Sequence, residues 1–200
     1  GDWDIADPGE LFQPRLWMTA EDWLDETPRA VQARVRYWDL AAGEVTSTNP
    51  DPDWTAGVRM ARLASGAYVV EHAVRQRATP AQTEDLVRET ARLDGSNCVQ
   101  WIEQVPGAGK ALVDHYRRNV CPLTVMMRGN PVKGSKGMRA RPLAAAWEKH
   151  RIKVVRGSWN ESLFDELESF SEDPSFSGPH DDQVDACAGA FEKVRLSVQA

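Results

Sequence analysis

The chain has 200 residues, of which 42% are hydrophobic and 27% charged, with a formal net charge of −6. These values predict one soluble globular domain, or one domain with a short appendage, and argue against a disordered chain. No run of about 18 apolar residues occurs, so we expect no membrane-spanning helix and no membrane partner. Three widely spaced cysteines, an odd number, argue against a disulfide framework and a zinc knuckle.

Residues 1–32 show no sustained periodicity and contain three prolines. We interpret them as a lead-in with one short helix over residues 19–26, capped by Thr19. The chain begins with glycine rather than methionine, which suggests a fragment of a longer protein. The folded domain is expected to begin at about Ala33 and to occupy residues 33–200.

The body of the chain alternates between strand and helix patterns. Period-two alternation predicts strands at residues 33–41, 54–63, 67–74, 97–103, 123–127 and 152–155. Capping residues followed by apolar residues at helical spacing predict helices at residues 79–95, 107–120, 141–150, 160–170 and 181–196. The glycine-rich segment 129–138 is expected to be a loop. Three strands in hairpin series, followed by helix–strand alternation, predict an α/β fold with a mixed central sheet of about five main strands, flanked by helices.

Carboxylates stand out at three places in this pattern. Asp39 lies in an apolar strand, where an unpaired carboxylate is costly, and Glu103 closes another strand. Asp181, Asp182 and Asp185 begin the last helix, and their spacing places Asp181 and Asp185 on one helix face. Acids at a helix start also cap amide groups, and a glutamate at a strand end is often merely exposed.

The set of carboxylates favours a metal site over those separate explanations. Carboxylates without basic partners in the local sequence repel one another, and a hard divalent cation is their natural counter-charge. Oxygen ligands select Mg²⁺ or Mn²⁺ over zinc. Two such ions would activate a water and stabilise the leaving oxygen of a phosphodiester. His180, directly before Asp181, either orients a ligand or the attacking water, or caps the helix.

The charge distribution suggests a polyanion as the substrate. Residues 1–30 account for the whole net charge, and the rest of the chain is neutral but segregated. Residues 128–156 contain nine lysines and arginines against one glutamate, whereas residues 157–192 contain ten acids and no lysine or arginine. A basic segment followed by an acidic one suits phosphate binding beside a metal site, although a solvated surface shows the same segregation.

The predicted phosphate contacts are Lys133, Lys136, Arg139, Arg141, Arg128 and Lys110. Lys110 follows Gly107-Ala108-Gly109, which resembles part of a P-loop. Gln104 and Ala111 stand where that motif requires glycine and serine or threonine, so we expect no ATP site of that kind.

Five segments in this order resemble the C-terminal nuclease domain of the large terminase subunit of tailed bacteriophages. They are YWDLA, DWTAGVRMA, WIEQVPGAGK, KGMRARPLAAAWEKHRIKVVRGSWNESLFDELESF and HDDQVDACAGAF. The resemblance covers about residues 33–196. It implies an RNase H-like fold and a metal-dependent endonuclease that cuts concatemeric double-stranded viral DNA at the start and end of head filling.

The resemblance also implies roles for single residues. Asp39 is the first-strand ligand shared by two Mg²⁺ or Mn²⁺ ions, and Glu103 is the second acid. The third comes from the last helix, where Asp182 and Asp181 rank first and Asp185 follows closely as a catalytic candidate.

Partners and location follow from the same resemblance. It implies an N-terminal ATPase motor to which residues 1–32 lead, portal and small-subunit partners, and a location in the host cytoplasm and transiently at the procapsid portal. Two alternatives stay open: a junction resolvase or transposase of the same fold, and a non-catalytic docking module of a packaging motor.

Overall fold

The computed structural model describes residues 11–41, 53–104, 107, 109–172 and 180–197. Its strands are β1 (Trp23–Leu24), β2 (Val31–Asp39), β3 (Thr55–Leu63), β4 (Tyr68–Gln76), β5 (Val99–Gln104), β6 (Met127–Pro131) and β7 (Ile152–Val155). Its helices are α1 (Pro14–Trp17), α2 (Pro80–Asp94), α3 (Gly109–His115), α4 (Lys136–Glu148), α5 (Asn160–Ser169) and α6 (Asp182–Leu196).

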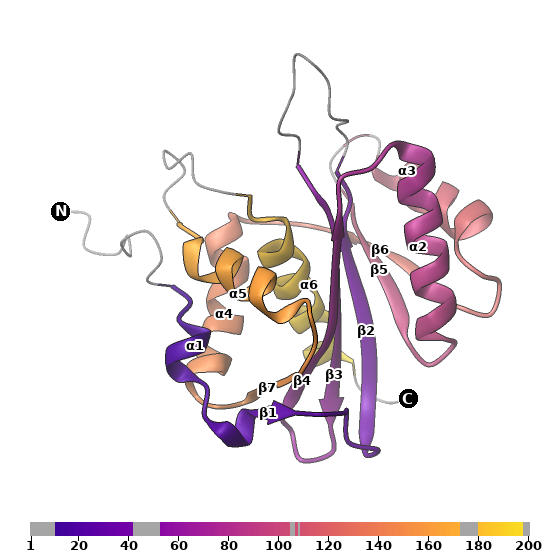
Figure 1. Ribbon diagram of the computed structural model, residues 1–200. Helices are drawn as coiled ribbons and strands as arrows, with labels where there is room; N and C mark the ends of the chain where they lie inside the picture. Colours follow the sequence, from indigo (N-terminus) through magenta and orange to yellow (C-terminus); the bar gives the residue numbers. More distant parts are fainter. Residues whose placement is uncertain (1–10, 42–52, 105–106, 108, 173–179, 198–200) are drawn as a thin grey trace.

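The seven strands form one mixed sheet in the order β1-β7-β4-β3-β2-β5-β6. Helices α1, α4, α5 and α6 lie on one side of this sheet, and α2 and α3 lie on the other (Figure 1). The predicted α/β fold is therefore confirmed. The short strand predicted at residues 152–155 is β7, and it extends one edge of the sheet together with β1, which was not predicted. None of the helices in the described ranges is long and apolar enough to cross a membrane.

The middle of the sheet is an antiparallel meander of β2, β3 and β4. The predicted hairpin turn between β3 and β4 is present, and Gly66 there has a φ of 85°, which a residue with a side chain rarely adopts. Strand β5 runs parallel to β2, and β6 runs parallel to β5. Parallel strands bring their carboxyl ends to the same edge, so the ends of β2 and β5 are neighbours.

Strand β2 is buried on both faces because helices cover both sides of the sheet. Val35 and Tyr37 belong to the core cluster on the α6 side, whereas Trp38 packs with residues of α2 and β5. Arg36 is only 1% exposed and forms an ion pair with Asp94 at the end of α2. A buried arginine is tolerated here because the carboxylate and the carbonyl oxygen of Gly57 accept its N–H groups.

Helix α6 packs on β2 and β3 through a run of small residues, Ala186–Ala190, all of which are buried. At Gly189 the backbone lies directly on the ring of Tyr37, where a Cβ would fall 2.5 Å from Cε1. Helix α6 therefore packs closely onto the sheet. It fixes the position of the acidic first turn of α6 over the end of β2.

Several predicted boundaries are wrong between residues 107 and 141. The strand expected at 123–127 lies instead at Met127–Pro131, and Leu123 is 99% exposed in the preceding turn. The loop expected at 129–138 is shorter and covers residues 132–135, between the end of β6 and the start of α4. Helix α4 begins at Lys136 because the hydroxyl of Ser135 accepts a hydrogen bond from the Met138 N–H and caps it. The helix expected at 107–120 is α3 followed by a π-helical turn.

The helix expected at residues 19–26 is also wrong, since only a single 3₁₀ turn, Ala20–Asp22, forms there. Thr19 and Asp22 close that turn with reciprocal hydrogen bonds, and the chain then enters β1, which pairs with β7. Phe12 is fully buried in the core. The described part of the lead-in therefore packs on the domain, and its connection to an ATPase stays a prediction.

Candidate active site

Asp39 and Glu103 lie at the ends of neighbouring parallel strands. Asp39 is the last residue of β2 and Glu103 is the penultimate residue of β5. Trp38 stands opposite Ile102 in the register, so the next residue along each strand, Asp39 and Glu103, falls on the same row. Both side chains point to the side of the sheet that α6 occupies, because they follow Tyr37 and Trp101 by two residues.

The third group of carboxylates reaches this edge from the first turn of α6. Asp185 precedes Gly189 by four residues, so it shares the helix face that rests on Tyr37. Tyr37 in turn precedes Asp39 by two residues on the same strand face. The four-residue spacing in the helix and the two-residue spacing in the strand together place Asp185 over Asp39. Asp182 and Asp185 are 7% and 3% exposed.

The environment of the Asp39 carboxylate is unfavourable for a negative charge. Burial, followed by the neighbouring carboxylates of Asp185, Glu103 and Asp182, raises its pKa well above the usual range. No described residue forms a hydrogen bond or a close ion pair with it, although the ammonium group of Lys136 opposes part of the rise in its pKa. An unpartnered carboxylate among three others is a cation-binding arrangement, and its oxygen donors suit a hard divalent ion. The residues therefore fit the metal that the sequence predicted.

The other carboxylates have basic partners that the local sequence did not reveal. Lys136 Nζ lies 2.6 Å from Asp181 Oδ1 and 2.9 Å from Asp185 Oδ2. Arg139 Nη1 lies 3.0 Å from Glu103 Oε2, and its Nη2 lies 2.9 Å from Asp185 Oδ1. The first turn of α4 thus brings two predicted phosphate contacts onto the acids themselves. Basic partners are absent from the local sequence, as stated above, but this distant segment supplies them.

These contacts shift the pKa of both kinds of group. Burial raises the pKa of Asp185, although Lys136 and Arg139 oppose that shift. Burial lowers the pKa of Lys136, but Asp185 and Asp181 outweigh it and the net change is upward. In the metal-free protein, the lysine and the arginine therefore neutralise part of the acidic cluster.

Asp182 faces away from that pair, toward the chain segment that precedes β3. Its Oδ2 accepts a hydrogen bond of 3.0 Å from the backbone N–H of Trp54. His180 Nδ1 lies 3.6 Å from the same oxygen and 3.5 Å from Asp53 Oδ1. Ligand atoms of Asp53, His180 and Asp182 all lie within 4.8 Å of one another, a spacing that can hold a metal ion. Asp53 was missed in the sequence, because its residue type and position before β3 carry no distinctive signal.

Behind Asp182, a buried glutamate holds the start of α6. Glu166 on α5 accepts hydrogen bonds from the backbone N–H of Gln183 and from its side-chain amide, and Arg75 Nη1 lies 3.2 Å from its Oε2. Burial raises the pKa of Glu166 to about 7. The sequence predicted only that Glu166 lies in a helix. Its contact with Gln183 joins two different helices, and the sequence pattern of neither helix indicates it.

The remaining predicted phosphate contacts are dispersed. Arg141 pairs with Glu172, Arg128 lies over the ring of Trp101, and Lys133 is exposed on the wall of a pocket that Arg139 also lines. Lys110 is exposed on α3, on the opposite side of the sheet from α6. Of the predicted set, only Lys136 and Arg139 contact the carboxylates.

Comparison with known proteins identifies one matching family and several similar solved structures. The family described as terminase RNaseH-like domain matches residues 36–193. No curated protein matches the chain.

Solved structures of the same fold include terminase nucleases from phage and from a human virus. The large terminase nuclease from thermophilic phage G20c with bound magnesium has 19% identity and a TM-score of 0.58 over 84% of each chain. The human cytomegalovirus terminase nuclease domain, soaked with manganese and bound to an inhibitor, has 11% identity and a TM-score of 0.65 over 92% of this chain and 95% of that one. The predicted RNase H-like fold is confirmed.

Proposed function

The chain belongs to the terminase RNaseH-like domain family, and from this premise we propose that it is the nuclease domain of a large terminase subunit. It hydrolyses phosphodiester bonds of concatemeric double-stranded viral DNA during genome packaging. One observation carries the proposal: Asp39 is buried without a hydrogen bond or close ion pair to a described residue, and it lies among the carboxylates of Glu103, Asp182 and Asp185, which come from β5 and α6.

Asp39, Glu103, Asp185 and Asp182 are the residues that would hold divalent cations, with Asp181 at the rim of the same cluster. His180 and Asp53 extend the donor set beside Asp182. Solved relatives contain zinc, magnesium or cobalt, which supports a site for divalent ions. Two ions of Mg²⁺ or Mn²⁺ would supply an activated water and charge stabilisation for the leaving oxygen.

Lys136 and Arg139 place positive charge at the carboxylate site, where a polyanion would bind. Lys136 and Arg139 stand at the carboxylates, so a phosphodiester entering the cluster meets two positive charges beside the acids. Arg139 Nε is buried and has no hydrogen-bond partner among the described residues, which leaves one donor of this guanidinium unused. We assign phosphate binding to these two residues.

The wider assembly follows from the family. We propose that residues 1–32 lead from an ATPase motor domain, and that the portal and the small terminase subunit are partners. The protein would then act in the host cytoplasm and transiently at the procapsid portal. The family match does not favour a junction resolvase, a transposase or a docking module.

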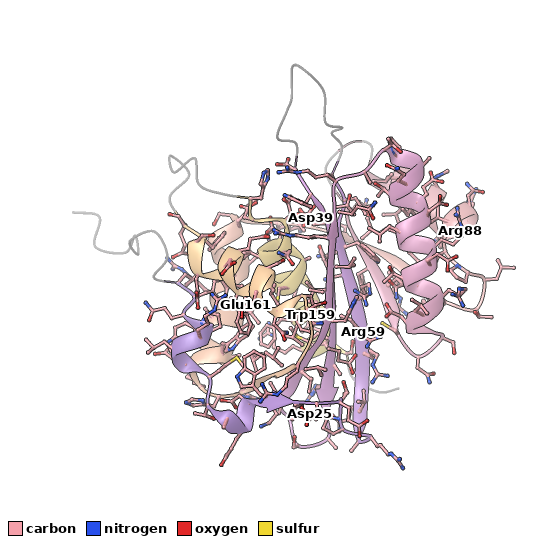
Figure 2. All side chains as sticks on the ribbon, in the orientation of Figure 1. Asp25, Asp39, Arg59, Arg88, Trp159 and Glu161 are labelled. Atoms are coloured by element: carbon pink, nitrogen blue, oxygen red, sulfur yellow. The ribbon has the colours of Figure 1, made fainter. Side chains whose placement is uncertain are left out.

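Plasmid nicking tests the proposed activity. We expect nicking of supercoiled DNA with Mn²⁺ or Mg²⁺, none with EDTA, and no preference for branched over linear duplexes. Asp39→Asn should reduce the rate at least about 100-fold. Asp25→Asn is the matched control, because Asp25 is exposed at the opposite end of the molecule (Figure 2). Equal rates for the parent and Asp39→Asn would contradict the proposal.

Thermal melting separates the nuclease from a docking module. An ion that binds only the folded state stabilises it by about 2.7 kcal/mol at 100 times its dissociation constant. We expect Mn²⁺ to raise the melting temperature of the parent, and a curve unchanged by millimolar Mn²⁺ would favour the docking module.

A further inference from the structure

Two positively charged side chains lie against the indole ring of Trp101, which precedes Glu103 by two residues on β5. Arg128 on β6 stands opposite Trp101 in the sheet register, and its Cζ lies 5.6 Å from the centre of the Trp101 ring. Lys193 on α6 reaches the same ring, with its Nζ 5.0 Å from the centre. The indole thus holds a guanidinium from one element and an ammonium from another in fixed positions.

These two cations are poorly neutralised by the protein. Arg128 is exposed, and no described carboxylate pairs with it; its Nε contacts only the sulfur of Met126. Lys193 has one carboxylate neighbour, the half-exposed Glu192, at 3.3 Å. The side chain of Lys193 is only 13% exposed, so its charge is held against the ring rather than free in solvent. The pair therefore presents net positive charge.

The pair lines an open hollow of about 540 Å³ beside α6. Helix α6 packs on β2 and β3, so the α6-side face of β5 next to it stays accessible at Trp101. The other walls carry Gln32, Arg34, Asn97 and Ser197 beside the apolar Ala33, Val99 and Leu196. A hollow that combines cations and polar groups with apolar side chains suits a nucleic acid strand, which has both phosphates and apolar surface.

The hollow is in line with the carboxylate site. Trp101 precedes Glu103 by two residues on the same face of β5, which separates them by about 7 Å along the strand. Arg128 precedes Asn130, the register partner of Glu103, by the same step. Successive phosphates of an extended nucleic acid strand are spaced similarly, so a strand with one phosphate at Glu103 would bring a neighbouring phosphate to Arg128 and Lys193.

We propose that Trp101, Arg128 and Lys193 form a phosphate subsite that holds the DNA strand beside the scissile phosphodiester. This inference rests on the proposed nuclease function and extends it to residues on β5 and α6 that the sequence did not single out, with Arg128 alone predicted as a DNA contact. Trp101 positions the two cations, and the cations bind the phosphate.

The test measures binding of a fluorescent DNA duplex by anisotropy over a salt series, in EDTA so that no cleavage occurs. Arg128→Gln and Lys193→Met should each weaken binding about three- to tenfold and lower the slope of log affinity against log salt by about 1. Trp101→Leu should weaken binding while leaving both charges in place, and Trp101→Phe should restore most of it. Arg92→Gln, an exposed arginine on α2, is the matched control and should bind as the parent does.

The outcomes separate the subsite from the function on which it rests. If the parent binds and cuts DNA but Arg128→Gln and Lys193→Met keep its affinity and salt slope, the subsite is wrong and the nuclease stands. If the parent neither binds nor cuts DNA, the proposed function fails and the subsite fails with it. Reduced affinity with a reduced slope in both charge variants, and an unchanged control, supports the subsite.

Discussion

The ring of Tyr37 and the α-carbon of Gly189 are in direct contact, and a Cβ at Gly189 would lie 2.5 Å from Cε1 of that ring. This contact joins the strand that ends at Asp39 to the helix that begins with Asp182 and Asp185. The contact sets the distance between the acidic first turn of α6 and the sheet. The uncharged Gly189 therefore determines how far the carboxylates of α6 lie from Asp39.

Gly189→Ala should therefore disturb the site as well as the core. Overpacking of this kind costs roughly 1–3 kcal/mol, and the helix must move away from Tyr37 to relieve it. We expect lower stability in urea and a loss of DNA cleavage at temperatures where the variant is still folded. Ala145→Gly, at an exposed position in α4, is the control, because it costs about 1 kcal/mol and should leave cleavage unchanged. Full cleavage by folded Gly189→Ala would contradict this account.

A buried ion-pair network stabilises the opposite side of the sheet. Asp94 accepts hydrogen bonds from Arg36 and Arg59, and its side chain is only 2% exposed. Asp94→Asn removes the charge that compensates Arg36 and should cost about 3–5 kcal/mol in urea unfolding. Asp85→Asn, at an exposed position on the same helix, should change stability by less than about 0.5 kcal/mol. A similar small loss for both variants would show that the network contributes little.

Glu166 predicts a pH dependence of stability with a defined sign. Burial raises its pKa to about 7 in the folded protein, from an ordinary value of 4.5. Between these values the folded state binds a proton that the unfolded state has lost, so this contribution is complete below about pH 4.5 and is lost as pH rises toward 7. The effect is on the order of 3 kcal/mol.

Glu166→Gln should remove that dependence and unfold with a flatter pH profile between pH 5 and about 7. The comparison uses urea unfolding of the parent, Glu166→Gln and the exposed-site control Glu161→Gln, whose profile should follow that of the parent. Identical profiles for the parent and Glu166→Gln would contradict the raised pKa.

Lys136 predicts opposite effects on metal-free stability and on ion binding. Its ammonium group neutralises Asp181 and Asp185, so Lys136→Ala should lower the melting temperature without metal and increase the stabilisation by Mn²⁺. The same variant should weaken binding to DNA duplexes of unrelated sequence alike, since phosphate contacts carry no base information. Lys149→Ala, at an exposed position after the same helix, is the control. Loss of binding confined to one sequence would contradict this role.

The sequence was sufficient for those parts of the site that follow from periodicity. Asp39 and Glu103 could be singled out because each is a carboxylate in a predicted strand of the same sheet. The acidic turn of α6 could be added because the small residues that follow it favour close packing of this helix on a sheet. These inferences use spacing within single elements, where local sequence determines side-chain direction.

Contacts between distant segments could not be predicted in the same way. The ion pair of Lys136 with Asp181 joins residues 45 positions apart, and nothing in either segment specifies the other. The hydrogen bond from the Trp54 N–H to Asp182 uses a backbone group, which has no sequence signal. The misplaced strand near Leu123 has the same cause, since Leu123 is exposed in a turn while the less apolar Met127–Pro131 pairs with β5.

Anomalous diffraction from a Mn²⁺-soaked crystal tests the central claim most directly. The claim is that carboxylates from β2, β5 and α6 converge to hold divalent cations. We predict manganese density in contact with oxygens of Asp39, Glu103 and at least one of Asp185 and Asp182. Density confined to Asp53 and His180, or no density at the carboxylates in crystals where manganese binds elsewhere, would contradict it.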